Sequence, residues 1–331
     1  MFENRRVVVT GGAGFIGSYL TEELLNRNCR VTVIDDFSAG TMKNIHHLIK
    51  SPLLKVVKED LKNPRRLGKI VVENEVIFHL AANPEVRVGE TEPKVHFEEN
   101  VVVTFNLLEA MRRGKGDKTL VFTSTSTVYG EASQVPTPED YGPCVPISTY
   151  GGSKLASEAL ITSYMHTFNH KGLILRLANV IGPRSNHGVI YDFITKILRN
   201  PEELEILGDG RQEKSYLYIT DLISALMHLT ECSVESRGKT AIYNVGSKDK
   251  ITVKDIAKLV AKEMGCARLR CRFTGGVDGG RGWKGDVKNM QLSIQKIVSS
   301  GWKPKYSSKQ AVELTVRRLK RELRKDQTFL D

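Results

Sequence analysis

The stretch VVVTGGAGFIG, residues 7–17, joins an apolar run to a loop with glycines at 11, 14 and 17. The apolar run has the length of a buried strand, and residues 15–27 have the apolar spacing of an amphipathic helix. In such a strand–loop–helix unit Gly11 permits the tight turn, Gly14 lets backbone approach a pyrophosphate, and Gly17 allows close helix–sheet packing. The helix N-terminus then faces the phosphates. The stretch therefore predicts a dinucleotide-binding βαβ unit.

The next apolar run, VTVID, ends in an acidic residue that lies 18 positions (35 − 17) after Gly17. A carboxylate at this point accepts hydrogen bonds from a ribose diol and repels a 2′-phosphate, which favours NAD over NADP. Asp35 is predicted for this role, and Asp36 is an alternative. A lone glycine triplet is often only a tight turn, but here the strand, the helix and the acid all stand in place.

Strand-like runs alternate with helical patterns from the N-terminus to about residue 180; the runs are RRVVVT, RVTVID, LKVVKED, EVIFHLAA, TLVFTS and LILRLAN. This alternation indicates a parallel sheet covered on both faces. We predict an α/β fold, with a doubly wound parallel Rossmann domain over residues 1–178 and a smaller α/β C-terminal substrate domain over residues 179–331. The segment YLYITDLISALMHLTE is expected to rejoin the first domain at about residues 214–240.

Composition narrows the class of protein. The chain has 331 residues, 40% of them hydrophobic, and its apolar runs are too short to cross a membrane. The apolar run near the N-terminus is also too short for a signal peptide. Five scattered cysteines without CxxC spacing are typical of free thiols in a reducing compartment. We therefore expect a cytoplasmic protein without membrane insertion and without a metal site.

The net charge of +11 arises from 49 basic and 38 acidic residues, and basic residues concentrate in RRLKRELRK, residues 317–325. A nucleic-acid surface would use such a run. Leu and Glu alternate with the basic residues at helical spacing, however, which favours the exposed face of an amphipathic helix. No nucleic-acid partner is expected, and a pocket for a phosphorylated small molecule would use part of the excess charge.

Two further motifs indicate chemistry. TSTSTVYG, residues 123–130, places five hydroxyl residues at the end of a predicted strand, and YGGSK places Tyr150 and Lys154 on one helix face. A free tyrosine has a pKa near ~10 and is a poor base. A nearby ammonium and a positively charged nicotinamide would favour its phenolate. Tyr150 could then take a proton from a substrate hydroxyl while hydride leaves, and a hydroxyl of the cluster would orient the same oxygen.

The glycine loop, the hydroxyl-tipped strand and YxxxK, in this order, resemble the extended short-chain dehydrogenase/reductase family over nearly the whole chain. The resemblance is strongest to its nucleotide-sugar epimerases of the UDP-galactose 4-epimerase type. It implies NAD as a resident cofactor, a UDP-sugar as substrate, and a homodimer built from the helices that start near Asn100 and Ser148. It also implies that Thr125, 25 residues (150 − 125) before Tyr150, is the catalytic hydroxyl. Lys154 would keep Tyr150 acidic and hold the nicotinamide ribose.

The resemblance assigns further residues to the two ligands. The expected cofactor-binding residues are Gly11, Gly14, Phe15, Ile16, Gly17, Asp35, Asp36, Phe37, Ser38, Asp60, Leu61, Leu80, Ala81, Ala82, Asn100, Thr123, Tyr150 and Lys154. The expected substrate-binding residues are Thr125, Tyr150, Asn179, Gly188, Val189, Lys214, Tyr216, Arg281, Asp286 and Met290. Lys214 stands where these epimerases often have Arg, and Met290 where they vary a residue that limits bulk at C2 of the sugar.

The hydroxyl cluster contains no carboxylate. Related dehydratases read Thr-Asp-Glu before VYG and the decarboxylases read Thr-Ser-Glu, whereas this chain has Thr125-Ser126-Thr127. The resemblance therefore favours 4-epimerisation of a nucleotide-linked hexose. A dehydratase, a uronate decarboxylase or epimerase, and a keto-sugar reductase remain alternatives on the same fold. A cofactor-binding regulator without turnover is a further alternative, against which the intact Tyr150, Lys154 and Thr125 argue.

Overall fold

The computed structural model describes residues 2–114, 116–235, 240–266 and 268–327. The described residues fall into two compact units. The first unit comprises residues 1–128, 149–176 and 223–243, and the second comprises residues 129–148, 177–222 and 244–331. This division groups residues 129–148, which the sequence places in the first domain, with the second unit, and it returns to the first unit at residues 223–243, where the sequence predicts about 214–240. Residues 129–148 belong to the second unit because their backbone pairs with it: the Thr137 N–H donates to the Gln291 carbonyl at 2.9 Å.

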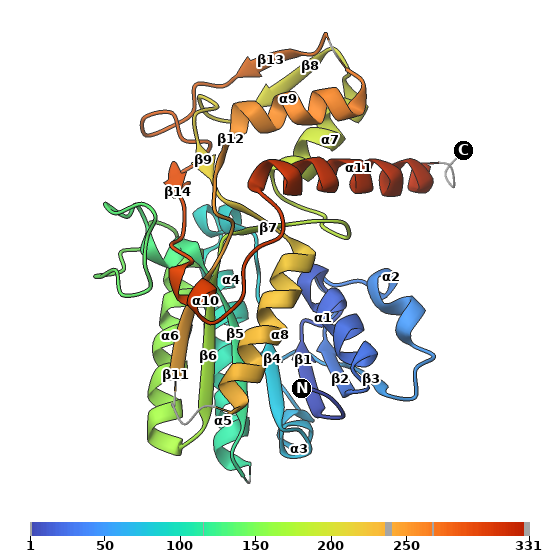
Figure 1. Cartoon of the computed structure of the whole chain (residues 1–331), viewed down its shortest axis with the longest axis vertical. Helices are drawn as coiled ribbons and strands as arrows, with labels where there is room; N and C mark the ends of the chain where they lie inside the picture. The colour runs from blue at the N-terminus through green and yellow to red at the C-terminus, as the bar shows by residue number, and fades with distance from the viewer. Residues whose placement is uncertain (1, 115, 236–239, 267, 328–331) are drawn as a thin grey trace. The chain divides into compact units, whose positions relative to one another are not determined.

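Among the described residues, seven strands form the sheet of the first unit, in the order β11-β6-β5-β4-β1-β2-β3 (Figure 1). They are β1 (Arg6–Thr10), β2 (Arg30–Asp35), β3 (Leu54–Lys58), β4 (Val76–His79), β5 (Thr119–Thr125), β6 (Lys171–Leu177) and β11 (Thr240–Val245). Central strands such as β5 are buried along their whole length, whereas in the edge strand β3 only Val57 is buried. Continuous apolar runs therefore mark strands that are covered on both faces.

Helices cover both faces of this sheet. The helices of the first unit are α1 (Phe15–Asn26), α2 (Met42–Ile45), α3 (Leu67–Val72), α4 (Pro93–His96), α5 (Val103–Arg113), α6 (Thr149–Phe168) and α8 (Ile219–Glu235), with short turns η1 (His46–Leu48), η2 (Val86–Glu90), η3 (Phe97–Val102) and η4 (Ser126–Tyr129). Leu107, Leu108 and Ile161 of α5 and α6 join strand residues in one buried core. Helices α1 and α8 lie side by side (Figure 1), and Arg27 pairs with Glu231 at 2.7 Å.

The second unit consists of short strands and helices of different lengths. Its strands are β7 (Asn179–Ile181), β8 (Glu203–Ile206), β9 (Glu213–Lys214), β10 (Tyr216–Tyr218), β12 (Ile251–Thr252), β13 (Arg270–Phe273) and β14 (Asn289–Met290). Its helices are α7 (Val189–Arg199), α9 (Val253–Met264), α10 (Gln295–Ser299) and the longer α11 (Ser308–Gln327). Helix α11 buries Val312, Val316 and Leu319, which have helical spacing, so the basic run at its end belongs to an amphipathic helix.

The position of β1 in the sheet decides where a ligand can bind. β1 pairs in parallel with β2 on one side and with β4 on the other, so the strand order reverses there. In open α/β sheets ligands bind outside the carboxyl ends of the strands at such a switch point. The loops that follow Thr10, Asp35, His79 and Thr125 all leave from this edge.

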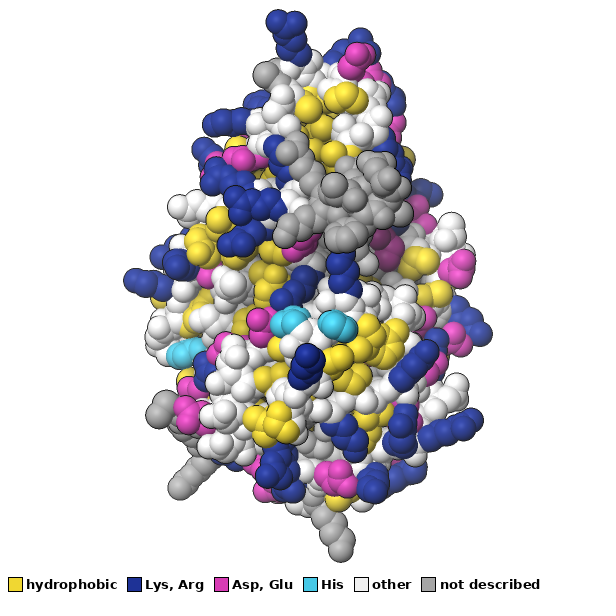
Figure 2. Space-filling model, turned by 90° about the vertical axis from the view of Figure 1, so that its right-hand side faces the viewer, with side chains coloured by type: hydrophobic (Ala, Val, Ile, Leu, Met, Phe, Trp, Pro, Cys, Tyr) yellow, Lys and Arg dark blue, Asp and Glu magenta, His cyan; other side chains and the backbone are white. Residues whose placement is uncertain are grey.

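In the described part of the chain, no helix is long and apolar enough to cross a membrane. Among the same residues, no three His, Cys, Asp or Glu side chains gather as a metal ion would require. Figure 2 shows Lys and Arg side chains scattered over one face, with Asp and Glu among them.

Candidate active site and cofactor site

The glycine loop is packed tightly against its neighbours. Gly11 has φ of 68°, a left-handed conformation that favours glycine. A Cβ on Gly11 would lie 2.9 Å from the Ala81 nitrogen, and one on Gly17 would lie 2.1 Å from the Gly11 carbonyl oxygen. Gly14 is the N-cap of α1 and has no side chain to occupy the first N–H groups of the helix. The loop therefore offers backbone donors at a helix N-terminus, which fits a pyrophosphate.

Asp35 ends β2 and ties the glycine loop to it. One carboxylate oxygen accepts from the Ala13 N–H at 2.8 Å and the other from the Phe37 N–H at 2.9 Å. Burial raises the pKa of this carboxyl group. Each oxygen keeps a second lone pair for a ribose diol. Asp36 is instead engaged in its own turn, where it accepts from the N–H and the hydroxyl of Ser38.

The end of β4 is held by a buried histidine that the sequence analysis did not single out. The His79 ring contacts the hydroxyls of Thr10 at 2.8 Å and Thr104 at 3.0 Å. The Thr10 oxygen also accepts from the N–H groups of Leu80 and Ala81, both at 3.2 Å. Burial lowers the pKa of His79 to about 3, so the ring is neutral. The HLAA segment is thereby fixed beside the glycine loop.

Asn100 lies in the π-helical turn η3 and braces the helix that carries Tyr150. Its side-chain oxygen accepts from the Asn83 N–H and its amide donates to the Ser153 hydroxyl, both at 2.8 Å. Ser153 in turn donates to the Tyr150 carbonyl at 2.7 Å. The expected support of the cofactor by Asn100 would therefore act through neighbouring residues.

Asp60 and Leu61 follow β3 at the same sheet edge. The Asp60 carboxylate accepts from the Lys62 N–H at 2.8 Å. The Leu61 side chain belongs to the buried core, so this residue has mainly its backbone to offer an adenine ring. Phe15, Ile16 and Ala82 are each half-buried.

Tyr150 and Thr125 meet at the end of β5. The Tyr150 residue is half-buried, and burial of its hydroxyl raises its pKa to about 12, while a hydrogen bond with the Thr125 side chain opposes this shift. The Thr125 oxygen also accepts from the Thr127 N–H at 3.2 Å and from the Thr127 hydroxyl at 3.1 Å. The hydroxyls of these three residues thus form a connected chain.

Lys154 lies one turn after Tyr150 on α6 and is buried. Its ammonium donates to the Thr123 carbonyl at 3.1 Å and lies 4.7 Å from the centre of the Phe122 ring. Burial lowers its pKa to about 7, opposed by the carboxylate of Glu158. Within the chain itself the pKa of Tyr150 is therefore raised, not lowered as the sequence led us to expect. Desolvation outweighs the hydrogen bond with Thr125, and the Lys154 ammonium is directed at the Thr123 carbonyl.

A buried ion pair supports the same strand and helix. The Arg176 guanidinium of β6 donates to both carboxylate oxygens of Glu158 on α6, with nitrogen–oxygen distances of 2.7 to 3.1 Å. Ser124 of β5 donates to the same carboxylate. This pair was not predicted; its signal in the sequence was Glu158 at i+4 from Lys154 on one helix face.

Four of the expected substrate residues lie together in the second unit. Tyr216 of β10 is the register partner of Asn179 in β7, and Met290 of β14 is the partner of Lys214 in β9. Tyr216 and Met290 are buried. Gly188 and Val189 lie elsewhere in this unit, at the start of α7, where Gly188 has φ of 89°.

Charged groups of opposite sign pair around β9. Lys214 forms an ion pair with Asp286, which is 2% exposed. Arg281 donates to the Asp286 carbonyl at 3.1 Å and forms an ion pair with Glu131. Lys214 and Arg281 thus both contact Asp286, and each forms an ion pair with an acid: Lys214 with Asp286, and Arg281 with Glu131. The role of Glu131 was not foreseen, because its partner is distant in sequence.

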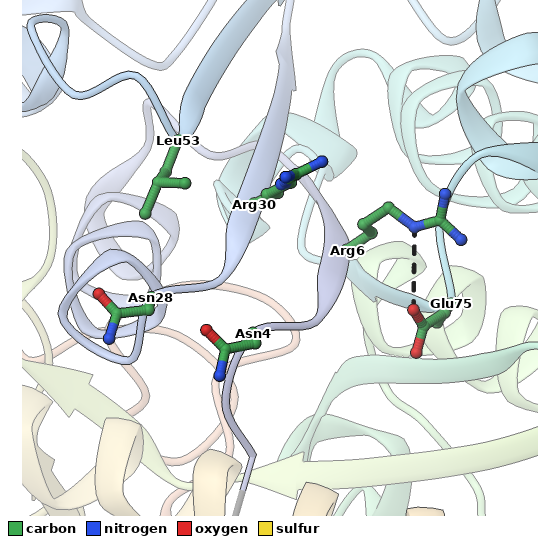
Figure 3. A pocket seen from close by; sticks show the side chains of 6 residues that line it. All are labelled: Asn4, Arg6, Asn28, Arg30, Leu53 and Glu75. Atoms are coloured by element: carbon green, nitrogen blue, oxygen red, sulfur yellow. Dashed lines mark ion pairs between the residues drawn. The ribbon is translucent and has the colours of Figure 1, made fainter.

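A separate hollow lies at the opposite edge of the sheet in the first unit (Figure 3). It is lined by Asn4, Arg6, Asn28, Arg30, Leu53 and Glu75. Arg6 and Arg30 are the first residues of β1 and β2, and Arg6 pairs with Glu75 at 3.8 Å. Because the hollow is at the amino ends of these strands, it is remote from Tyr150 and the glycine loop and is not the candidate site.

Comparisons with known proteins agree with this geometry. Residues 7–246 match the model of the NAD dependent epimerase/dehydratase family. A putative UDP-glucose 4-epimerase of Methanocaldococcus jannaschii is 33% identical over 95% of this chain and 98% of its own. UDP-glucuronic acid decarboxylase 4 of Arabidopsis thaliana is 32% identical over 97% of this chain and 70% of its own.

Solved structures of nucleotide-sugar epimerases are also similar to this chain. The chain is similar to a crystal structure of UDP-galactose 4-epimerase, with 43% identity, a TM-score of 0.84, and coverage of 96% of this chain and 99% of that one. The UDP-glucuronic acid 4-epimerase of Bacillus cereus, solved with UDP-glucuronic acid and NAD, has 30% identity, a TM-score of 0.85 and the same coverage. The predicted Rossmann fold and the predicted NAD cofactor are confirmed at the level of the family. The chain belongs to the NAD-dependent epimerase/dehydratase family of extended short-chain dehydrogenases/reductases, whose members act on nucleotide sugars.

Proposed function

We propose that this protein is a 4-epimerase of a UDP-linked hexose of the glucose and galactose type, which works through a 4-keto sugar. The observation that carries the proposal is the hydroxyl chain formed by Tyr150, Thr125 and Thr127. Two members of this chain can hold and move a proton on a sugar hydroxyl, and none is a carboxylate that could assist elimination or handle a 5-carboxylate.

In this proposal Tyr150 takes the proton of the C4 hydroxyl, and Thr125 orients the same oxygen by hydrogen bonding. NAD, when bound, supplies the acceptor and later the donor of the C4 hydride. Turning the keto sugar over in the site exposes its other face, and Tyr150 then returns the proton. Atoms balance because the sugar regains one hydride and one proton.

Tyr150 needs help to act as a base, because burial raises its pKa to about 12. The Thr125 hydroxyl stabilises the phenolate by donating to it. A positively charged nicotinamide would add to this effect. Lys154, which is already beside the Thr123 carbonyl at 3.1 Å, would hold the nicotinamide ribose.

For the substrate diphosphate we propose Lys214 and Arg281, which the pairing around β9 already brings to Asp286. The arriving diphosphate must compete with the carboxylates of Asp286 and Glu131 for these cations. Asn179, Gly188, Val189 and Tyr216 are proposed to contact the nucleotide part. Met290 is proposed to limit bulk at C2; because Met is flexible, an N-acetyl group would be tolerated there.

We further propose that the protein is a homodimer in the cytoplasm. Phe97, Phe105 and Phe168 are 58%, 43% and 39% exposed on η3, α5 and α6. Tyr164 connects two of them, with ring centres 6.4 Å from Phe105 and 5.1 Å from Phe168. Exposed aromatic groups of this kind are typical of association surfaces. The five cysteines, all within the described residues, are free thiols, as a reducing compartment requires.

A panel of substrates tests the function. Purified protein is incubated separately with UDP-glucose, UDP-galactose, UDP-glucuronic acid and UDP-N-acetylglucosamine, and the products are separated by chromatography. We expect UDP-glucose and UDP-galactose to interconvert, and Tyr150→Phe to be the inactive control. A pentose product with release of carbon dioxide from UDP-glucuronic acid, and no change of the neutral sugars, would contradict the proposal in favour of a decarboxylase.

A further inference from the structure

His96, a residue with no role in the mechanism above, lies against the proposed base. It ends α4 and is 1% exposed. Its ring centre lies 5.6 Å from that of Tyr150, with the ring planes at 63°, which is an edge-to-face arrangement. Both ring nitrogens of a buried imidazole need hydrogen-bond partners.

The partners of the imidazole fix its tautomer. Nε2 lies 3.1 Å from the Glu85 carbonyl oxygen, which only accepts, so Nε2 carries the proton of the neutral ring. Nδ1 lies 2.9 Å from the Thr149 hydroxyl and is left to accept from it. Burial lowers the pKa of His96, in agreement with a neutral ring. The ring therefore connects the segment before η2 to the first residue of α6.

A second contact shows how tightly this junction is packed. Gly89 of η2 approaches so closely that an added Cβ would lie 1.9 Å from the Thr149 hydroxyl oxygen and 2.8 Å from Nδ1 of His96. Only glycine leaves room for the hydrogen bond between these two groups. Because Tyr150 follows Thr149 directly, any shift at this junction moves the Tyr150 ring relative to Thr125.

We propose that His96 is a positioning residue for Tyr150: its neutral imidazole holds the start of α6 through Thr149 and supports the Tyr150 ring edge-to-face, so that the phenol stays in reach of Thr125. The role of Tyr150 as the base is taken from the proposed function. Displacement of a catalytic group by about 1 Å can cost on the order of 100-fold in rate, so a loosened junction should lower kcat.

Three variants probe the junction. His96→Phe keeps an aromatic ring against Tyr150 and removes both hydrogen bonds. Thr149→Val removes the donor to Nδ1 and keeps the size of the side chain, and Thr149→Ser restores the donor. We expect kcat to fall at least ~10-fold in His96→Phe and Thr149→Val, with KM and NAD content unchanged, and to recover in Thr149→Ser. The double variant His96→Phe/Thr149→Val should be no worse than His96→Phe alone, because the bond between the two residues is already absent there.

A second readout does not depend on turnover. The phenolate absorbance of Tyr150 is titrated in the NAD-bound protein, as the difference between each variant and the same variant carrying Tyr150→Phe. A ring displaced from Thr125 loses the hydrogen bond that favours its phenolate, so its pKa should rise by about one pH unit in His96→Phe and Thr149→Val. Thr149→Ser should titrate like the wild type.

The outcomes separate this inference from the proposed function. Normal kcat and an unshifted phenolate in Thr149→Val and His96→Phe would overturn the positioning role and leave the epimerase proposal intact. Failure of every UDP-sugar to react, with the phenolate still shifted in both variants, would overturn the proposed function alone. Multiplicative losses in the double variant, or a Thr149→Ser variant as impaired as Thr149→Val, would also contradict the coupling between His96 and Thr149.

Discussion

At the scale of single residues, desolvation favours the neutral form of both Tyr150 and Lys154. It raises the pKa of the tyrosine to about 12 and lowers that of the lysine to about 7, so each neutral form is favoured. The residue types and their spacing could be predicted from YGGSK. The direction of the pKa shift of Tyr150 could not be predicted. It depends on groups of β5 that bury the phenol and on the Thr123 carbonyl, which accepts the hydrogen bond of the Lys154 ammonium.

The first prediction concerns Tyr150. Tyr150→Phe removes the hydroxyl and keeps the ring, so we expect a folded protein that retains NAD. The rate should fall at least ~100-fold, the lower range for loss of a general acid–base. Turnover is measured by product separation and NAD by its release on denaturation. Near-normal turnover would mean that the base lies elsewhere.

The second prediction uses the lowered pKa of Lys154. Lys154 has a pKa of about 7 in the folded protein, whereas an ordinary lysine has a pKa of 10.5. Between these pH values the unfolded chain binds a proton that the folded chain lacks. The free energy of unfolding therefore rises with pH in this window, by up to about 1.4 kcal/mol per pH unit. Lys154→Met removes this dependence.

Urea unfolding of the NAD-free proteins at pH 7 and pH 9 measures the effect. The stability of the wild type relative to Lys154→Met should increase by roughly 2 kcal/mol between these pH values. A difference that stays constant with pH would show that Lys154 keeps its ammonium proton in both the folded and unfolded states.

At the scale of helices and strands, the alternation of apolar runs and helical patterns located the helices α1 and α5 and six of the strands in the described sheet closely. The remaining strand of that sheet, β11, was not predicted, because it lies in a part of the chain that was assigned to the second domain. The π-helical turn η3 could not be predicted, because residues 97–102 carry the same apolar spacing as the helix that follows. The partner of Glu158 was also hidden. Arg176 lies 18 residues later on a strand, and only the packing of α6 on β6 brings the two together.

The third prediction concerns this buried pair. Glu158→Gln leaves the Arg176 guanidinium without its counter-charge, and the loss of one partner of a buried ion pair costs roughly 3–5 kcal/mol. The matched control is Glu98→Gln, whose carboxylate pairs with Lys94 at the surface at 3.1 Å and should cost less than about 1 kcal/mol. Equal stability of the two variants in urea unfolding would contradict the importance of the buried pair.

At the scale of the whole molecule, the alternating pattern predicted two domains, but it assigned residues 129–148 to the first of them. Residues 129–148 follow the hydroxyl cluster directly in sequence, yet Tyr129 donates to Asn244 at 2.8 Å and the segment folds with the second unit. Such long-range pairing leaves no local signal. The ion pairs around Lys214 and Arg281 were hidden for the same reason.

The fourth prediction tests the proposed dimer. Phe105→Asp places a charge among the exposed aromatic rings of α5 and α6, so we expect sedimentation to shift from dimer to monomer. Val298→Asp, at a residue of α10 that is 37% exposed and outside this aromatic group, should remain dimeric. A monomeric wild-type protein would exclude the proposed assembly.

We propose that this enzyme moves only the C4 hydrogen of its sugar, and turnover in deuterated water tests this proposal. Hydride that passes to NAD and back in a closed site does not exchange with water, whereas a C5 proton removed for elimination does. We expect UDP-galactose to give its C4 epimer with no deuterium on any carbon and no change of mass. Deuterium at C5 or C6, loss of water, or release of carbon dioxide from a uronate substrate would contradict it.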